Sequence, residues 1–243
     1  MNIVHIGCSF SRGYYGHAEK DPNDPLLNLV DIIAKSYENI TFYNFSLYVS
    51  SIETQCAILK HLLRKKEKKI DAIIWQVTTA SRLGFVKDRK RFYNKVDYDF
   101  CRAGVVPNAL TLLQNSCNMN FDPWYATCFL NPGIVRDKKA NWRTKTFSQM
   151  MQYGINSVGT MHNTESSMAN IYYMKKIIEK QKIPILIFPW LSCFDKIDTL
   201  DCFDFVVENE IDFSKTWHDH GHHFGPTGME MVKDLVSPFI EKI

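Results

Sequence analysis

The sequence predicts a three-layer α/β/α sandwich around a parallel, flavodoxin-like sheet, in a single domain spanning residues 1–243. Short apolar runs alternate with longer segments of helical periodicity along much of the chain, which is typical of βαβ units. The runs at 71–77 and 183–190 are apolar almost throughout, as expected of strands buried on both faces of a parallel sheet. A chain of 243 residues is also long enough to bury the core of one such domain.

The N-terminal third predicts three strands separated by two helices. The strands are expected at 3–6, 40–45 and 71–77, where apolar residues form short runs. Apolar residues at helical spacing predict helices over 26–37 and 52–66. The apolar face of the second helix comprises Ile52, Cys56, Leu59, Leu62 and Leu63. Crossovers between the parallel strands are expected to be right-handed.

The rest of the chain predicts a long aperiodic segment followed by two further helices and two strands. Residues 83–163 lack clear periodicity, and so long a stretch between βα units indicates an insertion or lid. Its Trp124 and Trp142 either belong to the scaffold of this segment, the favoured interpretation, or stack on a sugar ring. The remaining elements are expected as helix 167–182, strand 183–190, a short strand at 204–207 and a closing helix at 227–240.

Composition excludes several classes of protein. A net charge of +3 is too small to indicate a nucleic-acid surface, and the basic run at 64–69 is expected to be a solvated helix end. The seven cysteines show no C-x-x-C spacing, which favours reduced thiols over a disulfide framework or zinc ribbon. No signal peptide or membrane-spanning segment is visible, so a cytoplasmic protein is expected.

The two ends of the chain contain the residues best suited to catalysis. The first strand stops at Gly7, and Ser9 follows in the turn, at the edge where open α/β sheets place their chemistry. A serine hydroxyl needs a neighbouring base to become a nucleophile. The segment 218–223, His-Asp-His-Gly-His-His, is the richest source of bases in the chain. It has no H-E-x-x-H type of arrangement, so no metal and no cofactor are expected there.

These two ends resemble the SGNH (GDSL-type) hydrolases. The turn I-G-C-S-F-S is similar to the family's first motif, which holds the nucleophilic serine, and D-H-G-H-H-F-G-P-T-G is similar to its last. The resemblance implies that Ser9 is the nucleophile and that Asp219 orients the base. Counting back from the Pro-x-Gly of the last motif makes His223 the base, whereas the usual Asp–His separation favours the rival His222.

The family's middle motifs imply an oxyanion hole, and the sequence departs from them in two places. N-F-S-L-Y-V-S-S resembles the second motif with Val49 in the glycine position, and Q-V-T-T stands where an asparagine is expected. The backbone N–H groups of Ser9 and of the Val49–Ser50 loop, with a hydroxyl of Thr78 or Thr79, would bind the oxyanion. Gln76 also keeps a donor at this edge. Arg82 would either clamp an anionic substrate group or pair with an acid.

The resemblance implies hydrolysis of an ester, such as an O-acetyl or other O-acyl group on a carbohydrate or small molecule. The expected partner is therefore a small-molecule or glycan ester, with neither nucleic acid nor membrane. Two alternatives stay open: a catalytically silent glycan-binding module of the same fold, and an acyltransferase that uses the same serine. The sequence does not distinguish hydrolysis from transfer and indicates no oligomeric state.

Overall fold

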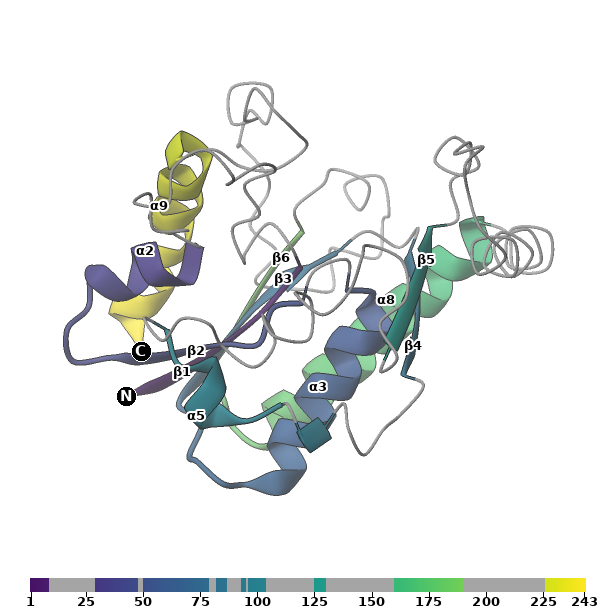
Figure 1. Cartoon of the computed structure of the whole chain (residues 1–243), viewed down its shortest axis with the longest axis horizontal. Helices are drawn as coiled ribbons and strands as arrows, with labels where there is room; N and C mark the ends of the chain where they lie inside the picture. The colour runs from purple at the N-terminus through teal and green to yellow at the C-terminus, as the bar shows by residue number, and fades with distance from the viewer. Residues whose placement is uncertain are drawn as a thin grey trace.

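The structure, a computed structural model of the whole chain, contains a parallel sheet flanked by helices (Figure 1). It describes residues 1–8, 29–47, 50–78, 82–86, 93–94, 96–103, 125–129, 160–189 and 226–243. The predicted strand at 204–207 lies outside these residues.

The central sheet has four parallel strands in the order β2-β1-β3-β6. They are β1 (Asn2–Ile6), β2 (Thr41–Asn44), β3 (Ala72–Val77) and β6 (Ile185–Pro189). The first strand lies inside the sheet between the second and the third, which is the flavodoxin-like arrangement that the sequence predicts. All six residues of β3 are buried, which explains why five of them are apolar without alternation, Gln76 being the exception.

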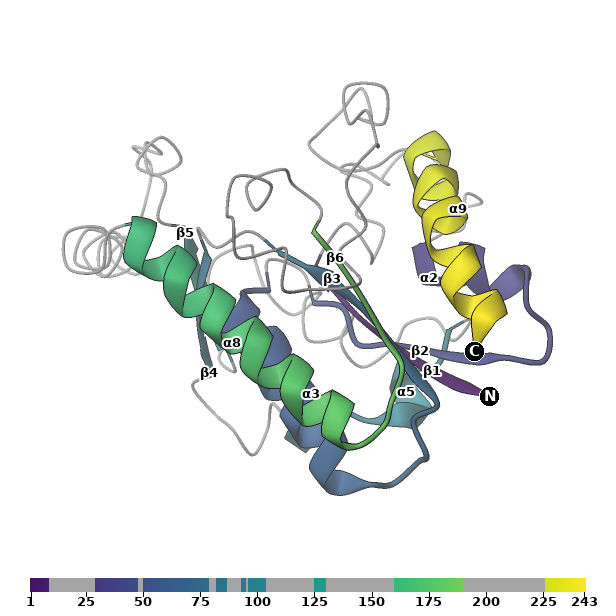
Figure 2. The ribbon, with the colours of Figure 1, turned by 180° about the vertical axis from the view of Figure 1, so that it is seen from behind.

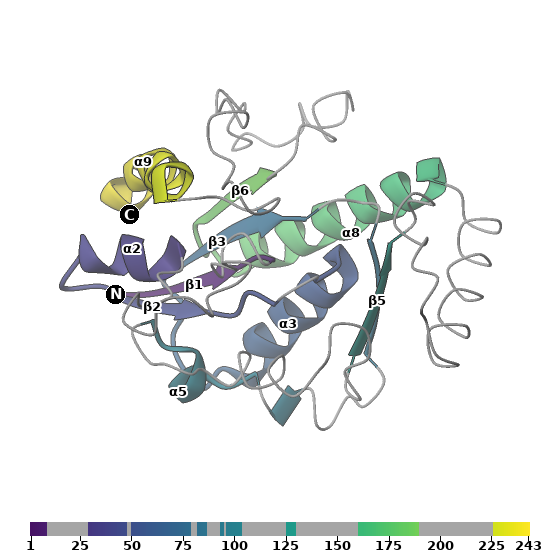
Figure 3. The ribbon, with the colours of Figure 1, turned by 45° about the horizontal axis from the view of Figure 1, so that its top comes forward.

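Two pairs of helices cover the two faces of the sheet (Figures 2 and 3). One face packs against α3 (Ile52–Lys65) and α8 (Thr160–Lys180), and the other against α2 (Leu29–Lys35) and α9 (Pro226–Lys242). Successive residues of β1 alternate between the faces: Val4 and Ile6 join the α3–α8 cluster, and Ile3 joins the α2–α9 cluster. The fold is therefore the three-layer α/β/α sandwich that the alternating pattern predicts.

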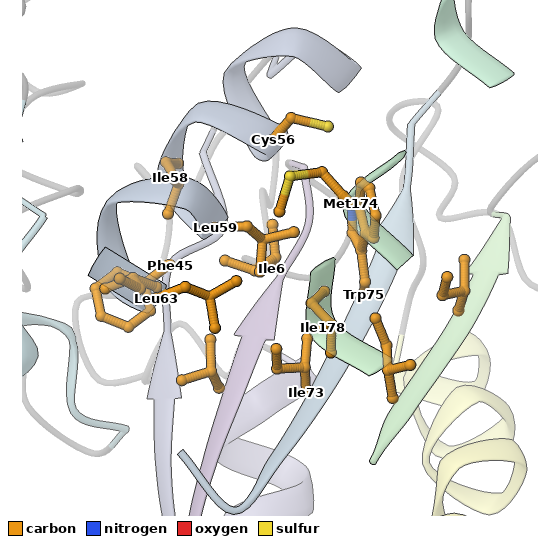
Figure 4. Close-up of a cluster of buried hydrophobic side chains, with 14 of the residues drawn as sticks. Ile6, Phe45, Cys56, Ile58, Leu59, Leu63, Ile73, Trp75, Met174 and Ile178 are labelled. Atoms are coloured by element: carbon orange, nitrogen blue, oxygen red, sulfur yellow. The ribbon is translucent and has the colours of Figure 1, made fainter. Parts of the chain in front are cut away.

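The larger core lies between the sheet and the α3–α8 layer. In Figure 4, Leu59 of α3 points toward Ile6 of β1, and Trp75 of β3 lies beside Met174 of α8. These four side chains are at most 1% exposed. Burying a large apolar side chain contributes about 1.5–3 kcal/mol each, so this interface is a main source of stability.

Local signals fix the ends of α3. The Ser51 side chain accepts a hydrogen bond from the Thr54 backbone N–H at 3.2 Å, which satisfies a donor that the first helical turn leaves without an intrahelical partner. At the other end, Lys66 adopts φ 50° and ψ 26°, the left-handed conformation that ends many helices. The basic run at 64–69 thus begins in the last turn of this helix, as the sequence predicts.

The aperiodic segment contributes elements that the sequence does not reveal. β4 (Arg82–Val86) pairs in antiparallel register with β5 (Tyr125–Phe129), forming a separate two-stranded sheet. The short helix α5 (Tyr98–Cys101) lies at the outer edge of β2, where Tyr98 packs edge-on against Tyr43 with ring centroids 4.9 Å apart. The Ala103 backbone N–H donates to Phe42 O at 2.8 Å, so this segment covers part of the edge of β2.

The helix α8 begins earlier than predicted. It starts at Thr160, seven residues before the predicted start at Ser167. The first two turns read T-M-H-N-T-E-S, and so polar a sequence has no apolar periodicity to indicate a helix. Among the described residues, no helix combines the length and the apolar character needed to cross a membrane.

Candidate functional site

The candidate site lies at the carboxyl edge of the sheet, where β1 and β3 end and α3 begins. Six residues here are at most 2% exposed, although most of them are polar: Cys8, Ser46, Ser50, Gln55, Gln76 and Thr78. A buried polar side chain is costly unless it is hydrogen-bonded. The hydrogen bonds among these residues therefore show which parts of the backbone this edge fixes in place.

The turn after β1 is held by two neighbouring segments. The Gly7 carbonyl oxygen accepts hydrogen bonds from the Ser50 hydroxyl at 2.9 Å and from the Leu47 N–H at 3.2 Å. On the other side, the Cys8 N–H donates to Gln76 Oε1 at 3.3 Å, and the Cys8 thiol contacts the same oxygen at 3.7 Å. The backbone of Gly7 and Cys8 is thus fixed by β3 and by the loop that precedes α3.

Gln55, in the first turn of α3, connects these contacts to one another. Its Nε2 donates to Ser50 Oγ at 3.2 Å and to the Gln76 backbone oxygen at 3.3 Å, and its Oε1 accepts from Trp75 Nε1 at 2.9 Å. The indole N–H is only a donor, which fixes the orientation of the Gln55 amide. One side chain therefore joins α3, β3 and the loop around Gly7.

His5 lies close to this edge of the sheet, but its environment does not suit a catalytic base. It is fully buried in β1, and its Nδ1 lies 3.2 Å from Ser46 Oγ. Its Nε2 has no hydrogen-bond partner within the described part of the chain. Burial lowers the pKa of His5 from 6.5 to about 3, so the ring is neutral at physiological pH. His5 is therefore a core histidine of β1.

The residues proposed from the sequence divide into three groups. Ser50, Gln76 and Thr78 are described and buried at the carboxyl edge. Arg82 is the first residue of β4, where it pairs with Phe129, and only its backbone is described. The remaining candidates, Ser9, Val49, Thr79, Asp219, His222 and His223, lie outside the described residues. Ser9 follows Cys8 directly in the chain.

The structure shows what two of the proposed donors contact. The Ser50 backbone N–H donates to Leu47 O at 3.2 Å, so an oxyanion would compete with that carbonyl for it. The oxygen end of the Gln76 amide faces the Cys8 N–H, because an N–H requires an acceptor. Through that oxygen, Gln76 holds the turn that precedes Ser9.

Sequence reasoning missed Gln55 as a member of this edge. Its position is detectable in principle, since Gln55 lies on the same helical face as Ile52, Cys56 and Leu59. A glutamine among apolar residues on a buried face needs internal hydrogen-bond partners. The apolar positions of this face predict the helix, whereas Gln55, the polar residue among them, indicates a hydrogen-bonded cluster at its N-terminus.

The described residues show no grouping of three or more His, Cys, Asp or Glu side chains that could hold a metal ion. Within the same part of the chain, Cys8, Cys56 and Cys101 are buried free thiols. Burial raises the pKa of the Cys56 thiol to about 12, which makes it unreactive in the folded protein.

Comparisons with known proteins provide no identification at the level of sequence. No family model matches the chain, and no curated protein matches it. Among solved structures, the chain is similar to AlinE4, an SGNH-hydrolase family esterase, with a TM-score of 0.41 and 13% sequence identity. The alignment covers 99% of this chain and 95% of that one. A similarity at this level supports no conclusion about activity, and the fold assignment depends on the strand order and the two buried layers.

Proposed function

We propose that the chain is a serine-dependent ester hydrolase with Ser9 as its nucleophile. The observation that supports this most is the fixed turn after β1, in which Gly7 O, Cys8 N and Cys8 Sγ all have buried hydrogen-bond partners. An acyl-transfer enzyme needs its nucleophile held in one geometry, because small displacements reduce the rate strongly. The residue that follows this turn is a serine, and its motif resembles that of the SGNH hydrolases.

The proposed chemistry uses the other end of the chain as the base. Ser9 Oγ attacks the ester carbonyl carbon while His223 accepts the hydroxyl proton, giving a tetrahedral oxyanion. Collapse of this intermediate breaks the bond to the alcohol, which leaves with that proton. Water then attacks the acyl-enzyme and gives a proton to His223, and collapse breaks the bond to Ser9 Oγ, which takes that proton back as the carboxylic acid leaves. Asp219 orients and stabilises the imidazolium, and His222 remains the rival base.

The start of α3 favours negative charge at this edge. The helix begins at Ile52, two residues after Ser50, whose hydroxyl donates a hydrogen bond to Gly7 O. The N-terminus of a helix has a partial positive charge, which stabilises anions close to it. The N–H groups of Ser9 and of the Val49–Ser50 loop, with Thr78 or Thr79, would supply the direct hydrogen bonds. The substrate that we propose is an O-acyl ester of a carbohydrate or small molecule.

One observation favours a second candidate, a catalytically silent glycan-binding module. The Ser50 N–H, one of the proposed oxyanion donors, already has an acceptor in Leu47 O. Loss of one donor typically lowers the rate of acyl transfer by about 100-fold to 1,000-fold. An acyltransferase with the same serine is the third candidate, and it differs only in the acceptor of the acyl group.

The test is turnover of short-chain aryl esters and O-acetylated sugars by the wild type and by Ser9→Ala. The proposal predicts that Ser9→Ala lowers kcat/KM by at least about 1,000-fold. Ser36→Ala, at an exposed position just after α2, is the matched control and retains full activity. Turnover that persists in Ser9→Ala would contradict the proposal. Acetylated sugar formed from an added acceptor would indicate the transferase instead, and sugar binding without any turnover would indicate the silent module.

A further inference from the structure

We infer that Gln55 is the positioning residue of the Gly7–Cys8 turn and, through it, of Ser9. The inference rests on the proposed function in so far as Ser9 is the nucleophile. Gln55 is fully buried, so it acts on the turn through its neighbours. Its three side-chain hydrogen bonds join Trp75, Ser50 and the backbone of Gln76.

The direction of the hydrogen bonds explains why Gln55 controls the turn. A serine hydroxyl has a single proton, and Ser50 uses it to donate to Gly7 O. The Ser50 oxygen can then only accept from its other neighbours, and Gln55 Nε2 donates to it. An acceptor in place of that nitrogen would attract the Ser50 proton away from Gly7 O.

The second connection runs through β3. Gln55 Nε2 also donates to the backbone oxygen of Gln76, the residue whose side chain accepts from the Cys8 N–H. The Trp75 indole N–H fixes the opposite end of the Gln55 amide. Gln55 therefore sets the geometry on both sides of the turn: Gly7 through Ser50 and Cys8 through Gln76.

Two substitutions remove the proposed positioning contacts in different ways. Gln55→Met keeps a similar volume but removes all three hydrogen bonds. Gln55→Glu keeps an acceptor for the Trp75 N–H and replaces the donor that faces Ser50 and Gln76 with an oxygen. Ile58→Val and Ile58→Ala are the controls, because Ile58 is a fully buried residue of the same helix and core. Their losses of stability, measured by urea unfolding, are expected to bracket those of the Gln55 variants.

The first readout is alkylation of Cys8 by iodoacetamide in the native protein, with peptide mapping, and it does not depend on activity. Cys56 is the internal control, since it is a buried thiol of α3 that becomes exposed only when the helix or the core opens. We expect both Gln55 variants to raise the ratio of Cys8 to Cys56 alkylation about tenfold. Without the Gln55 hydrogen bonds, local opening of the turn costs less free energy, so Cys8 is exposed more often. The Ile58 controls leave the ratio unchanged.

The second readout is the rate at which a fluorophosphonate labels Ser9, together with kcat and KM for an aryl ester. A residue that positions the nucleophile without touching substrate affects kcat and the labelling rate, so we expect both to fall about tenfold or more with KM unchanged. Equal alkylation ratios and labelling rates in the Gln55 and Ile58 variants of matched stability would overturn the inference. Absence of labelling in the wild type would overturn the proposed function, and the Cys8 ratio would still decide whether Gln55 holds the turn.

Discussion

The side-chain oxygen of Gln76 accepts a hydrogen bond from the backbone N–H of Cys8 at 3.3 Å, although the two residues are 68 positions apart in the chain. Their strands lie side by side, with Ile6 of β1 paired to Trp75 of β3. Cys8 lies two residues beyond the end of β1, whereas Gln76 is still within β3, and the Gln76 side chain satisfies the Cys8 backbone N–H there. The turn that leads to Ser9 is therefore fixed by the parallel sheet itself.

Replacing Gln76 tests this contact. Gln76→Leu removes the acceptor and leaves the Cys8 N–H buried without it, so we expect a loss of about 1–3 kcal/mol in the free energy of unfolding. Urea denaturation followed by circular dichroism measures it. Gln181→Leu, at an exposed position after α8, is the control and is expected to change stability by less than about 0.5 kcal/mol. Similar stabilities of the two variants would contradict the assigned role of Gln76.

Ser51 is expected to stabilise the N-terminus of α3. Its side chain caps the helix through the Thr54 N–H, so Ser51→Ala should cost about 0.5–2 kcal/mol of stability. Ser51→Thr keeps the capping oxygen and should recover most of this loss. Thermal unfolding of the two variants provides the comparison, and an unchanged midpoint in Ser51→Ala would show that the cap contributes nothing.

His5 predicts a specific dependence of stability on pH. Its pKa in the folded protein, about 3, lies below its ordinary value of 6.5 because the ring is buried. The unfolded chain therefore takes up the proton first, and stability falls as the pH drops from about 6.5 toward 3. The slope due to one such group is about 1.4 kcal/mol per pH unit. We expect His5→Gln to reduce the slope of unfolding free energy between pH 4 and 6 by about this amount; an unchanged slope would mean that another group causes it.

Asp71 is expected to act in a lower pH range. Its carboxylate contacts Lys69 Nζ at 2.6 Å and accepts a hydrogen bond from the Asn2 N–H at 2.8 Å. These two contacts, of which Lys69 has the larger effect, hold the pKa of Asp71 below its ordinary value of 3.8. The stabilisation is thus present above pH 3.8 and is lost as the pH falls through the lower folded value. Asp71→Asn should therefore make stability fall less steeply in acid-induced unfolding below pH 3.8, a transition followed by circular dichroism. Asp234→Asn, on the exposed face of α9, should leave that transition unchanged.

The sequence predicts the sheet well because its strands are buried on both faces. The runs that become β1, β3 and β6 can be recognised without knowing their partners, since parallel strands between two helical layers are mostly apolar. The β4–β5 pair is different. Its strands are separated by 38 residues of sequence and lie in a segment without periodicity, so only the three-dimensional pairing reveals them.

The candidate site is only partly accessible to sequence reasoning. The motif around Ser9 predicts a nucleophile after β1, but the hydrogen bonds that hold Cys8 come from Gln76, 68 positions away in the chain. Gln55 was missed because helical periodicity identifies apolar positions, whereas its importance comes from three polar contacts made across the fold. Hydrogen-bond direction, such as that of the Ser50 hydroxyl, depends on geometry that no spacing rule contains.

The measurement that tests the central claim most directly is the intact mass of the protein after incubation with a fluorophosphonate, followed by peptide mapping. The proposed mechanism predicts one adduct, located on Ser9 and lost in Ser9→Ala. It predicts the same loss in Asp219→Ala and in His223→Ala, whereas loss in His222→Ala instead would move the base by one residue. An unmodified wild-type mass after prolonged incubation, in a protein that remains folded, would contradict a serine nucleophile at this edge.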